Sequence, residues 1–155
     1  MKTAIEEMKN LFDVILIDTS AYLSEIHMSI LEEADDLLLI SKSDLSALRN
    51  SKLYLDTLDS MNLLGKVKLV LNKEAKKRPL EPKKIEEILG VTVDAILPEQ
   101  NNVTNSIAVG QPYIIMYPRN ALSKSIFLLL NNINGQESQE KNTRKQNKRR
   151  SLVKR

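Results

Sequence analysis

The sequence predicts an α/β fold, in which a mainly parallel sheet is flanked by helices in three layers. Short apolar runs alternate with longer stretches whose apolar residues recur every three or four positions, as strands alternate with helices. In addition, 42% of the 155 residues are hydrophobic, which is enough for the core of one domain. Aromatic residues make up only 4%, so the expected core is aliphatic.

The first predicted strand covers residues 13–18. It contains four consecutive apolar residues, Val14 to Ile17, and such a run is typical of a strand buried on both faces of a parallel sheet. Further apolar runs predict three more strands, at residues 36–40, 67–71 and 91–97. Pro98 ends the last of them, and the segment between Pro112 and Pro118 is expected to be extended.

Helices are predicted before the first strand, between the strands and after the last strand, at residues 3–11, 23–33, 44–61, 82–90, 103–109 and 121–133. Ser43 or Asp44 is expected to cap the third of these helices. The inner face of that helix is expected to carry Leu45, Leu48, Leu55 and Leu58. Gly65, Gly90 and Gly110 are interpreted as helix ends, because glycine readily adopts the left-handed conformation that terminates a helix.

The net charge of +3 hides two oppositely charged parts. Residues 135–155 hold eight Lys or Arg and two Asp or Glu, whereas residues 1–134 hold fifteen and eighteen. We therefore expect a folded domain over residues 1–134 and a disordered, basic tail over residues 135–155. The tail could contact an anionic membrane or nucleic acid weakly through its charge, but it has no aromatic residue for stacking on bases.

Composition also excludes several classes of site. The chain has no cysteine and a single histidine, His27, which argues against disulfides, thiolate metal sites and histidine-based catalysis. The sequence begins without the apolar core of a signal peptide, and no apolar run approaches the roughly 20 residues that span a bilayer. We therefore expect a cytoplasmic protein without a transmembrane segment, with peripheral association at the inner membrane as an option.

Asp18 is the candidate metal-binding carboxylate of the sequence. Asp18 directly follows the first predicted strand, and the carboxyl edge of a parallel sheet is where ligands bind. A carboxylate there can hold a Mg²⁺-bound water beside the phosphates of a nucleotide. The glycine-rich loop that normally cradles those phosphates is absent from the 155 residues, since the Gly65-Lys66 pair has no upstream glycines and no following Ser or Thr.

The order of the motifs resembles the carboxyl-terminal half of a MinD/ParA-type ATPase. Within that family it is most similar to the pilus-assembly CpaE/TadZ branch. The resemblance covers about residues 1–133 and rests on VILIDT, on VLN, and on three short motifs at matching distances: Leu23-Ser24, Ala34-Asp35 and Leu48-Arg49-Asn50. It implies a partial P-loop NTPase fold of the SIMIBI type.

The resemblance also implies roles for five residues. Asp18 corresponds to the aspartate that binds Mg²⁺ through water. Asn72 corresponds to the asparagine that reads the adenine edge, with Lys73, Pro98 and Glu99 on the adenine side of the site. The family binds ATP with Mg²⁺, and we expect this chain alone not to bind it tightly, because it lacks the phosphate loop. Residues 20–22 also depart from the family, which carries a proline and a nearby glycine there.

Three functional hypotheses follow. The first is a truncated MinD/ParA/CpaE-like ATPase domain, related to proteins that position or assemble pili, septa or partition complexes and not catalytic alone. The second is a non-catalytic protein-binding module on the same fold, and the third is the carboxyl half of a bacterial tyrosine-kinase domain. The expected partner is a protein, either a missing amino-terminal half or a second copy.

The resemblance predicts an anomaly in the sheet. In the family, the strand that carries the phosphate loop lies between the strands corresponding here to residues 13–18 and 36–40. Without it, either these two strands close directly on each other, or a partner or second copy fills the gap, or the monomer is unstable.

Overall fold

The computed structural model describes residues 2–20, 22, 24–77 and 79–133, so the predicted tail at residues 135–155 lies outside the described residues. The helices are α1 (Lys2–Lys9), α2 (Glu25–Glu33), α3 (Leu45–Ser60), α4 (Pro82–Leu89), α5 (Val103–Val109), α6 (Tyr113–Met116) and α7 (Ala121–Ile133), with a short 3₁₀ helix η1 (Leu64–Lys66). The strands are β1 (Leu37–Ser41), β2 (Val67–Glu74) and β3 (Val93–Pro98). Every helix among the described residues is too short or too polar to cross a lipid bilayer.

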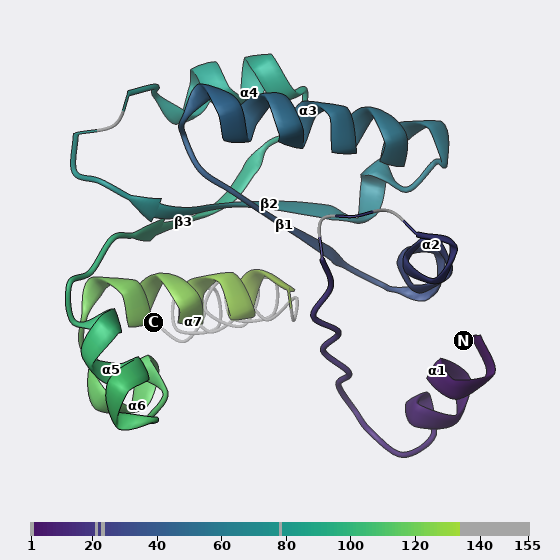
Figure 1. Ribbon diagram of the computed structural model, residues 1–155, viewed down its shortest axis with the longest axis horizontal. Coiled ribbons are helices and arrows are strands. Elements are labelled where there is room, and N and C mark those ends of the chain that lie inside the picture. The colour runs from purple at the N-terminus through teal and green to yellow at the C-terminus, as the bar shows by residue number, and fades with distance from the viewer. Residues whose placement is uncertain (1, 21, 23, 78, 134–155) are drawn as a thin grey trace, which may run out of the picture.

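The three strands form a parallel sheet in the order β1-β2-β3. Leu39 of β1 pairs with Leu69 of β2, and Leu71 of β2 pairs with Ile96 of β3. Helices α3 and α4 cover one face of the sheet, and α7 lies on the other face (Figure 1). The predicted α/β fold with a parallel sheet between helices is therefore confirmed.

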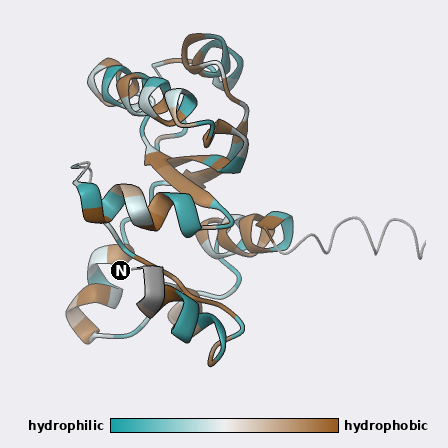
Figure 2. Ribbon diagram, turned by 90° about the vertical axis from the view of Figure 1, so that its right-hand side faces the viewer, coloured by the Kyte–Doolittle hydropathy of each residue, from teal (hydrophilic) through white to brown (hydrophobic). Residues whose placement is uncertain are grey.

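The main core lies between the sheet and the layer of α3 and α4. It consists of two buried residues from each of three elements, namely Leu48, Leu55, Leu69, Leu71, Ile85 and Leu89. Figure 2 shows the strands as a hydrophobic band between helices of mixed character. Burying each such side chain contributes about 1.5–3 kcal/mol, so this aliphatic cluster is the main source of stability.

Capping residues fix the ends of three helices. Asp44 caps α3 by accepting a hydrogen bond from the Ala47 backbone at 2.8 Å, which decides between the two predicted caps. Gly90 and Gly110 end α4 and α5 in the left-handed conformation, as predicted. Ser43 is instead buried, with its backbone N–H directed toward β2.

The prediction for Gly65 is wrong. The chain leaves α3 through Asn62, whose φ of 58° takes the left-handed conformation that asparagine tolerates. Gly65 lies inside η1, and the ammonium group of Lys66 donates to the carbonyls of Glu32 and Ala34 at the end of α2. The Gly65-Lys66 pair therefore has a structural role in joining η1 to α2.

Two smaller predictions also fail. Leu45 is exposed, because it is the first residue of α3 and the buried face begins one turn later at Leu48. Residues 113–116 form the single-turn helix α6 rather than an extended segment. Pro112 suits the start of a helix, and Pro118 disfavours the helical conformation at Tyr117, so the two prolines bound a turn of helix.

The strand predicted at residues 13–18 is not present. The chain there is extended, but it joins no strand and runs by itself below the sheet (Figure 1). A strand is defined by a hydrogen-bonded neighbour, and among the described residues this segment has none. The predicted alternative in which residues 13–18 pair directly with β1 is therefore not what this structure shows. The described sheet also has no other strand between this segment and β1.

Candidate functional site at the carboxyl edge of the sheet

The parallel sheet brings the predicted adenine-side residues together. Asn72 and Lys73 lie at the carboxyl end of β2, while Pro98 ends β3 and Glu99 follows it. The register joins the two ends, because Glu74 pairs with Pro98 and the Glu99 N–H donates to the Glu74 carbonyl at 2.9 Å. The four residues therefore line one edge, where open α/β sheets bind ligands.

Asn72 lies at an irregularity of β2, where the register with β3 shifts between Leu71 and Glu74. Its side-chain oxygen accepts a hydrogen bond from the Lys73 N–H at 2.9 Å, and Lys73 has a φ of 55°. A non-glycine residue in this conformation costs about 1–2 kcal/mol. The Asn72 amide keeps two N–H donors and a second lone pair on its oxygen, which is the pairing capacity that an adenine edge requires.

Glu74 is a residue of this edge that the sequence did not indicate as functional. It is buried, with 4% of its surface exposed, and its carboxylate accepts from the Ser43 N–H at 3.0 Å. Its own carbonyl holds Glu99. One residue therefore links the chain ends after β1, β2 and β3. The only sequence signal was a carboxylate three residues after the apolar run Leu69–Leu71 of β2.

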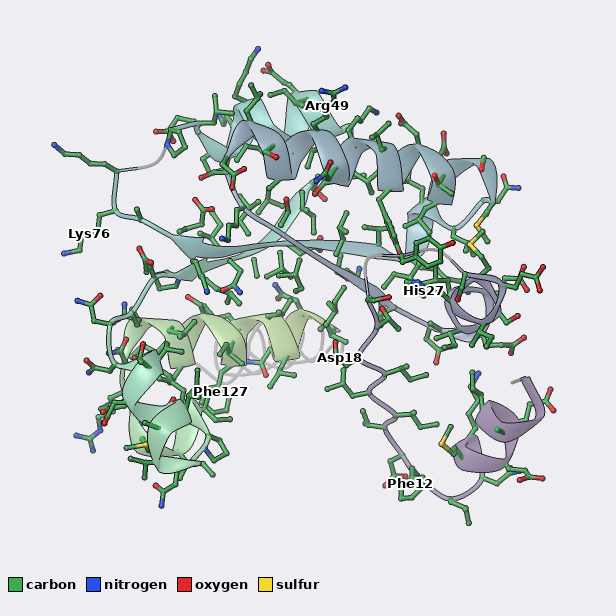
Figure 3. All side chains as sticks on the ribbon, viewed as in Figure 1. Phe12, Asp18, His27, Arg49, Lys76 and Phe127 are labelled. Carbon is green, nitrogen blue, oxygen red and sulfur yellow. The ribbon has the colours of Figure 1, made fainter. Side chains whose placement is uncertain are left out.

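The edge is also positively charged. Lys42 follows β1, and Lys73, Lys76 and Lys77 belong to β2 and the loop after it, all with exposed side chains. Figure 3 shows Lys76 reaching outward from this loop. Clustered lysines raise the local concentration of anions, so the edge suits an anionic ligand.

Asp18 is not part of this cluster. It is exposed at the end of the isolated extended segment, and Figure 3 shows it below the sheet and well away from Lys76. Among the described residues, no group of three or more His, Asp or Glu side chains is arranged to hold a metal ion. The described structure therefore brings together the four residues predicted for the adenine side, and it does not bring Asp18 to them.

Known proteins share this fold. No protein-family model matches the chain. The septum site-determining protein MinD of Synechocystis is 22% identical over 120 residues, covering 74% of this chain and 45% of the relative. The MinC:MinD cell division protein complex of Aquifex aeolicus matches with a TM-score of 0.76 and 23% identity, over 86% of this chain and 57% of that chain. A ParA family ATPase of Chlorobium tepidum gives 0.73 and 22%, over 79% and 52%.

The chain has the fold of the MinD and ParA ATPases. A MinD from Pyrococcus horikoshii, solved as a complex with Mg-ADP, matches with a TM-score of 0.72 and 21% identity over 84% of this chain and 54% of that chain. The chain spans about half the length of the curated relatives that it matches.

Proposed function

We propose that this chain is the base-side portion of a MinD/ParA-type nucleotide switch and that it does not hydrolyse ATP alone. The observation that carries the proposal is the grouping of Asn72, Lys73, Pro98 and Glu99 on one edge of the sheet, in a sequence without a glycine-rich phosphate loop. The base-side contacts come from this chain, whereas the phosphate contacts require other residues.

The strength of nucleotide binding follows from this division. Phosphate loops supply several backbone N–H groups and a lysine to the phosphates, and those contacts hold most of the charge of a nucleotide. Without them, an asparagine amide and surface lysines leave only weak, millimolar recognition. Asp18 remains our candidate for the Mg²⁺-water ligand, provided that further protein brings it to the phosphates.

Calorimetry and NMR test the proposal together. We expect no saturable heat with Mg-ATP in the micromolar range and no turnover. At millimolar ATP, we expect chemical shift changes to centre on Asn72, Lys73 and Glu99, and to disappear in Asn72→Ala. The matched control is Asn50→Ala, which removes an exposed asparagine from α3. Micromolar binding, turnover or shift changes located elsewhere would contradict the proposal.

The cellular role is the finer part of the proposal. The CpaE-like motif places Leu48 in the core, whereas Arg49 and Asn50 are exposed on α3. We infer a role in positioning or assembling a cellular structure, with pilus assembly as the specific assignment, in the cytoplasm and at the inner membrane. Loss of pili on deletion of the coding region, restored by the wild-type chain and not by Arg49→Ala, would support it; unchanged pili would contradict it.

A second candidate, a non-catalytic protein-binding module, is favoured by one surface. Helices α5 and α6 contact each other and expose Ile107, Val109 and Ile115. Exposed apolar residues that gather on neighbouring elements often mark protein-binding sites. Partner capture that is lost in Ile107→Lys and retained in Asn72→Ala would favour this module over the nucleotide switch.

A further inference from the structure

The backbone between Leu71 and Glu74 is fixed at both ends and irregular in between. Leu71 is fully buried and pairs with both neighbouring strands. The register with β3 then shifts, and pairing with β3 resumes at Glu74. Asn72 and Lys73 therefore lie between two fixed points, and the position of the Asn72 amide depends on both of them.

The conformation of residues 72–73 has to be enforced by their surroundings. Lys73 has a φ of 55°, which is unfavourable for a residue with a β-carbon, and such a conformation persists only where neighbouring contacts fix it. The hydrogen bond from the Lys73 N–H to the Asn72 side chain is local and moves with these two residues. In the loop that follows, the described residues 75–77 and 79 are all exposed. Glu74 is therefore the buried anchor on the carboxyl side of Asn72.

The contacts of Glu74 suit an anchor. Only 4% of its surface is exposed, and its carboxylate accepts a hydrogen bond from the Ser43 N–H at 3.0 Å. Its carbonyl accepts from the Glu99 N–H at 2.9 Å. Ser43 is itself 6% exposed and comes directly before Asp44, which caps α3. The carboxylate thus ties the irregular part of β2 to the start of a helix that belongs to the main core.

We propose that Glu74 is a positioning residue for base recognition, because its hydrogen bond to Ser43 holds the Asn72 amide in the orientation that receives the adenine edge. The side chain of Glu74 is buried, so it acts through Asn72 and not on the base itself. An amide that is already oriented loses less freedom when a base binds, and this raises the affinity. The inference rests on the proposed function and adds a residue to the four that the sequence predicted for the base side.

Two variants separate the reach of this side chain from its charge. Glu74→Gln keeps the acceptor oxygen in place and removes the charge, whereas Glu74→Asp keeps the charge and draws the carboxylate back from Ser43 by one methylene. Glu74→Met, which fills the same space without an acceptor, replaces Glu74→Asp if that variant does not fold. The matched control is Ser51→Ala, which removes a different buried hydrogen bond, from Ser51 Oγ to Ser41 Oγ at 2.8 Å. It reports what a general loss of stability does to the site.

NMR relaxation of the chain without nucleotide measures the orientation directly. We expect the side-chain NH₂ group of Asn72 to be ordered in the wild type, in Glu74→Gln and in Ser51→Ala, and to become mobile in Glu74→Asp. An Asn72 amide that stays ordered in Glu74→Asp, or that is equally mobile in Glu74→Gln and Glu74→Asp, would overturn the proposal. Equal mobility in Ser51→Ala and Glu74→Asp would overturn it as well, since the effect would then follow stability alone.

A titration with millimolar Mg-ATP, followed by NMR, links this orientation to binding. The dissociation constant should rise at least about threefold in Glu74→Asp and stay within about twofold of the wild-type value in Glu74→Gln and Ser51→Ala. Unchanged affinity in Glu74→Asp would overturn this inference and leave the proposed function standing. If ATP causes no chemical shift changes in the wild type, both the proposed function and this inference are wrong.

Discussion

Glu74 joins three strand ends through one side chain and one carbonyl. Replacing Glu74 with alanine leaves the buried Ser43 N–H without its acceptor, and a buried donor without a partner costs about 1–3 kcal/mol. We therefore expect Glu74→Ala to lower the free energy of unfolding by that amount in urea titrations. Glu74→Gln keeps an acceptor oxygen and should lose less. Equal stability of Glu74→Ala and the wild type would show that the link is not important.

Tyr54 should make the folded protein less stable at alkaline pH. Its hydroxyl lies 3.4 Å from His27 Nε2, and burial raises the pKa of Tyr54 above its ordinary value of 10.0. Above pH 10.0 the unfolded chain releases this proton while the folded protein retains it, so stability should fall as the pH rises. Thermal melts between pH 9 and pH 11 measure the loss.

The control compares Tyr54 with an exposed tyrosine. Tyr54→Phe should weaken the pH dependence, whereas Tyr22→Phe, which changes an exposed side chain, should leave it intact. A pH dependence that is the same in both variants would assign the alkaline loss to other groups.

At the level of elements, glycine conformation separates two positions that look alike in sequence. Gly90 has a φ of 77°, where a β-carbon is strained, so Gly90→Ala should destabilise the protein by about 1–2 kcal/mol. Gly65 has no left-handed φ and no atom within 4 Å of an added β-carbon. Gly65→Ala should therefore be stabilising by about 0.4–1 kcal/mol. Chemical denaturation of both variants checks the contrast, and equal destabilisation would contradict it.

Local sequence predicted the elements that local interactions determine. The apolar runs of β1, β2 and β3 and the capped helices α3, α4 and α5 were located because their signals lie within a few residues. The segment 13–18 carries an equally strong apolar run, yet it is not a strand, because a strand requires a neighbour that no local pattern specifies. The left-handed Asn62 was missed for a related reason, since the nearby Gly65 is the commoner residue for that conformation.

The candidate site was predictable only where strand order is simple. Asn72, Lys73, Pro98 and Glu99 meet because β2 and β3 are adjacent and parallel. Asp18 depends on a strand that the described sheet does not include, so its place could not follow from spacing. Glu74 was missed because its role comes from Ser43, thirty-one residues earlier in the chain.

For the molecule as a whole, we expect the basic tail at residues 135–155 to contribute nothing to stability. It has too few apolar residues to offset an ordering cost of about 1–2 kcal/mol per residue. A change of about 1 kcal/mol in the free energy of unfolding shifts the melting temperature of a domain of this size by several degrees. Because we expect almost no change in that free energy, deleting the tail should leave the melting temperature within about one or two degrees. Differential scanning calorimetry checks this, and a drop of many degrees would mean that the tail packs on the domain.

The central position of β2 has a consequence for synthesis on the ribosome. β1 pairs only with β2 among the described strands, and the pairing of Leu39 with Leu69 joins residues thirty positions apart. At about 5–20 residues per second, β1 is complete for a few seconds before its neighbour is made. During that interval both edges of β1 are open, so nascent chains that lie close together on one messenger RNA have time to associate before the sheet forms.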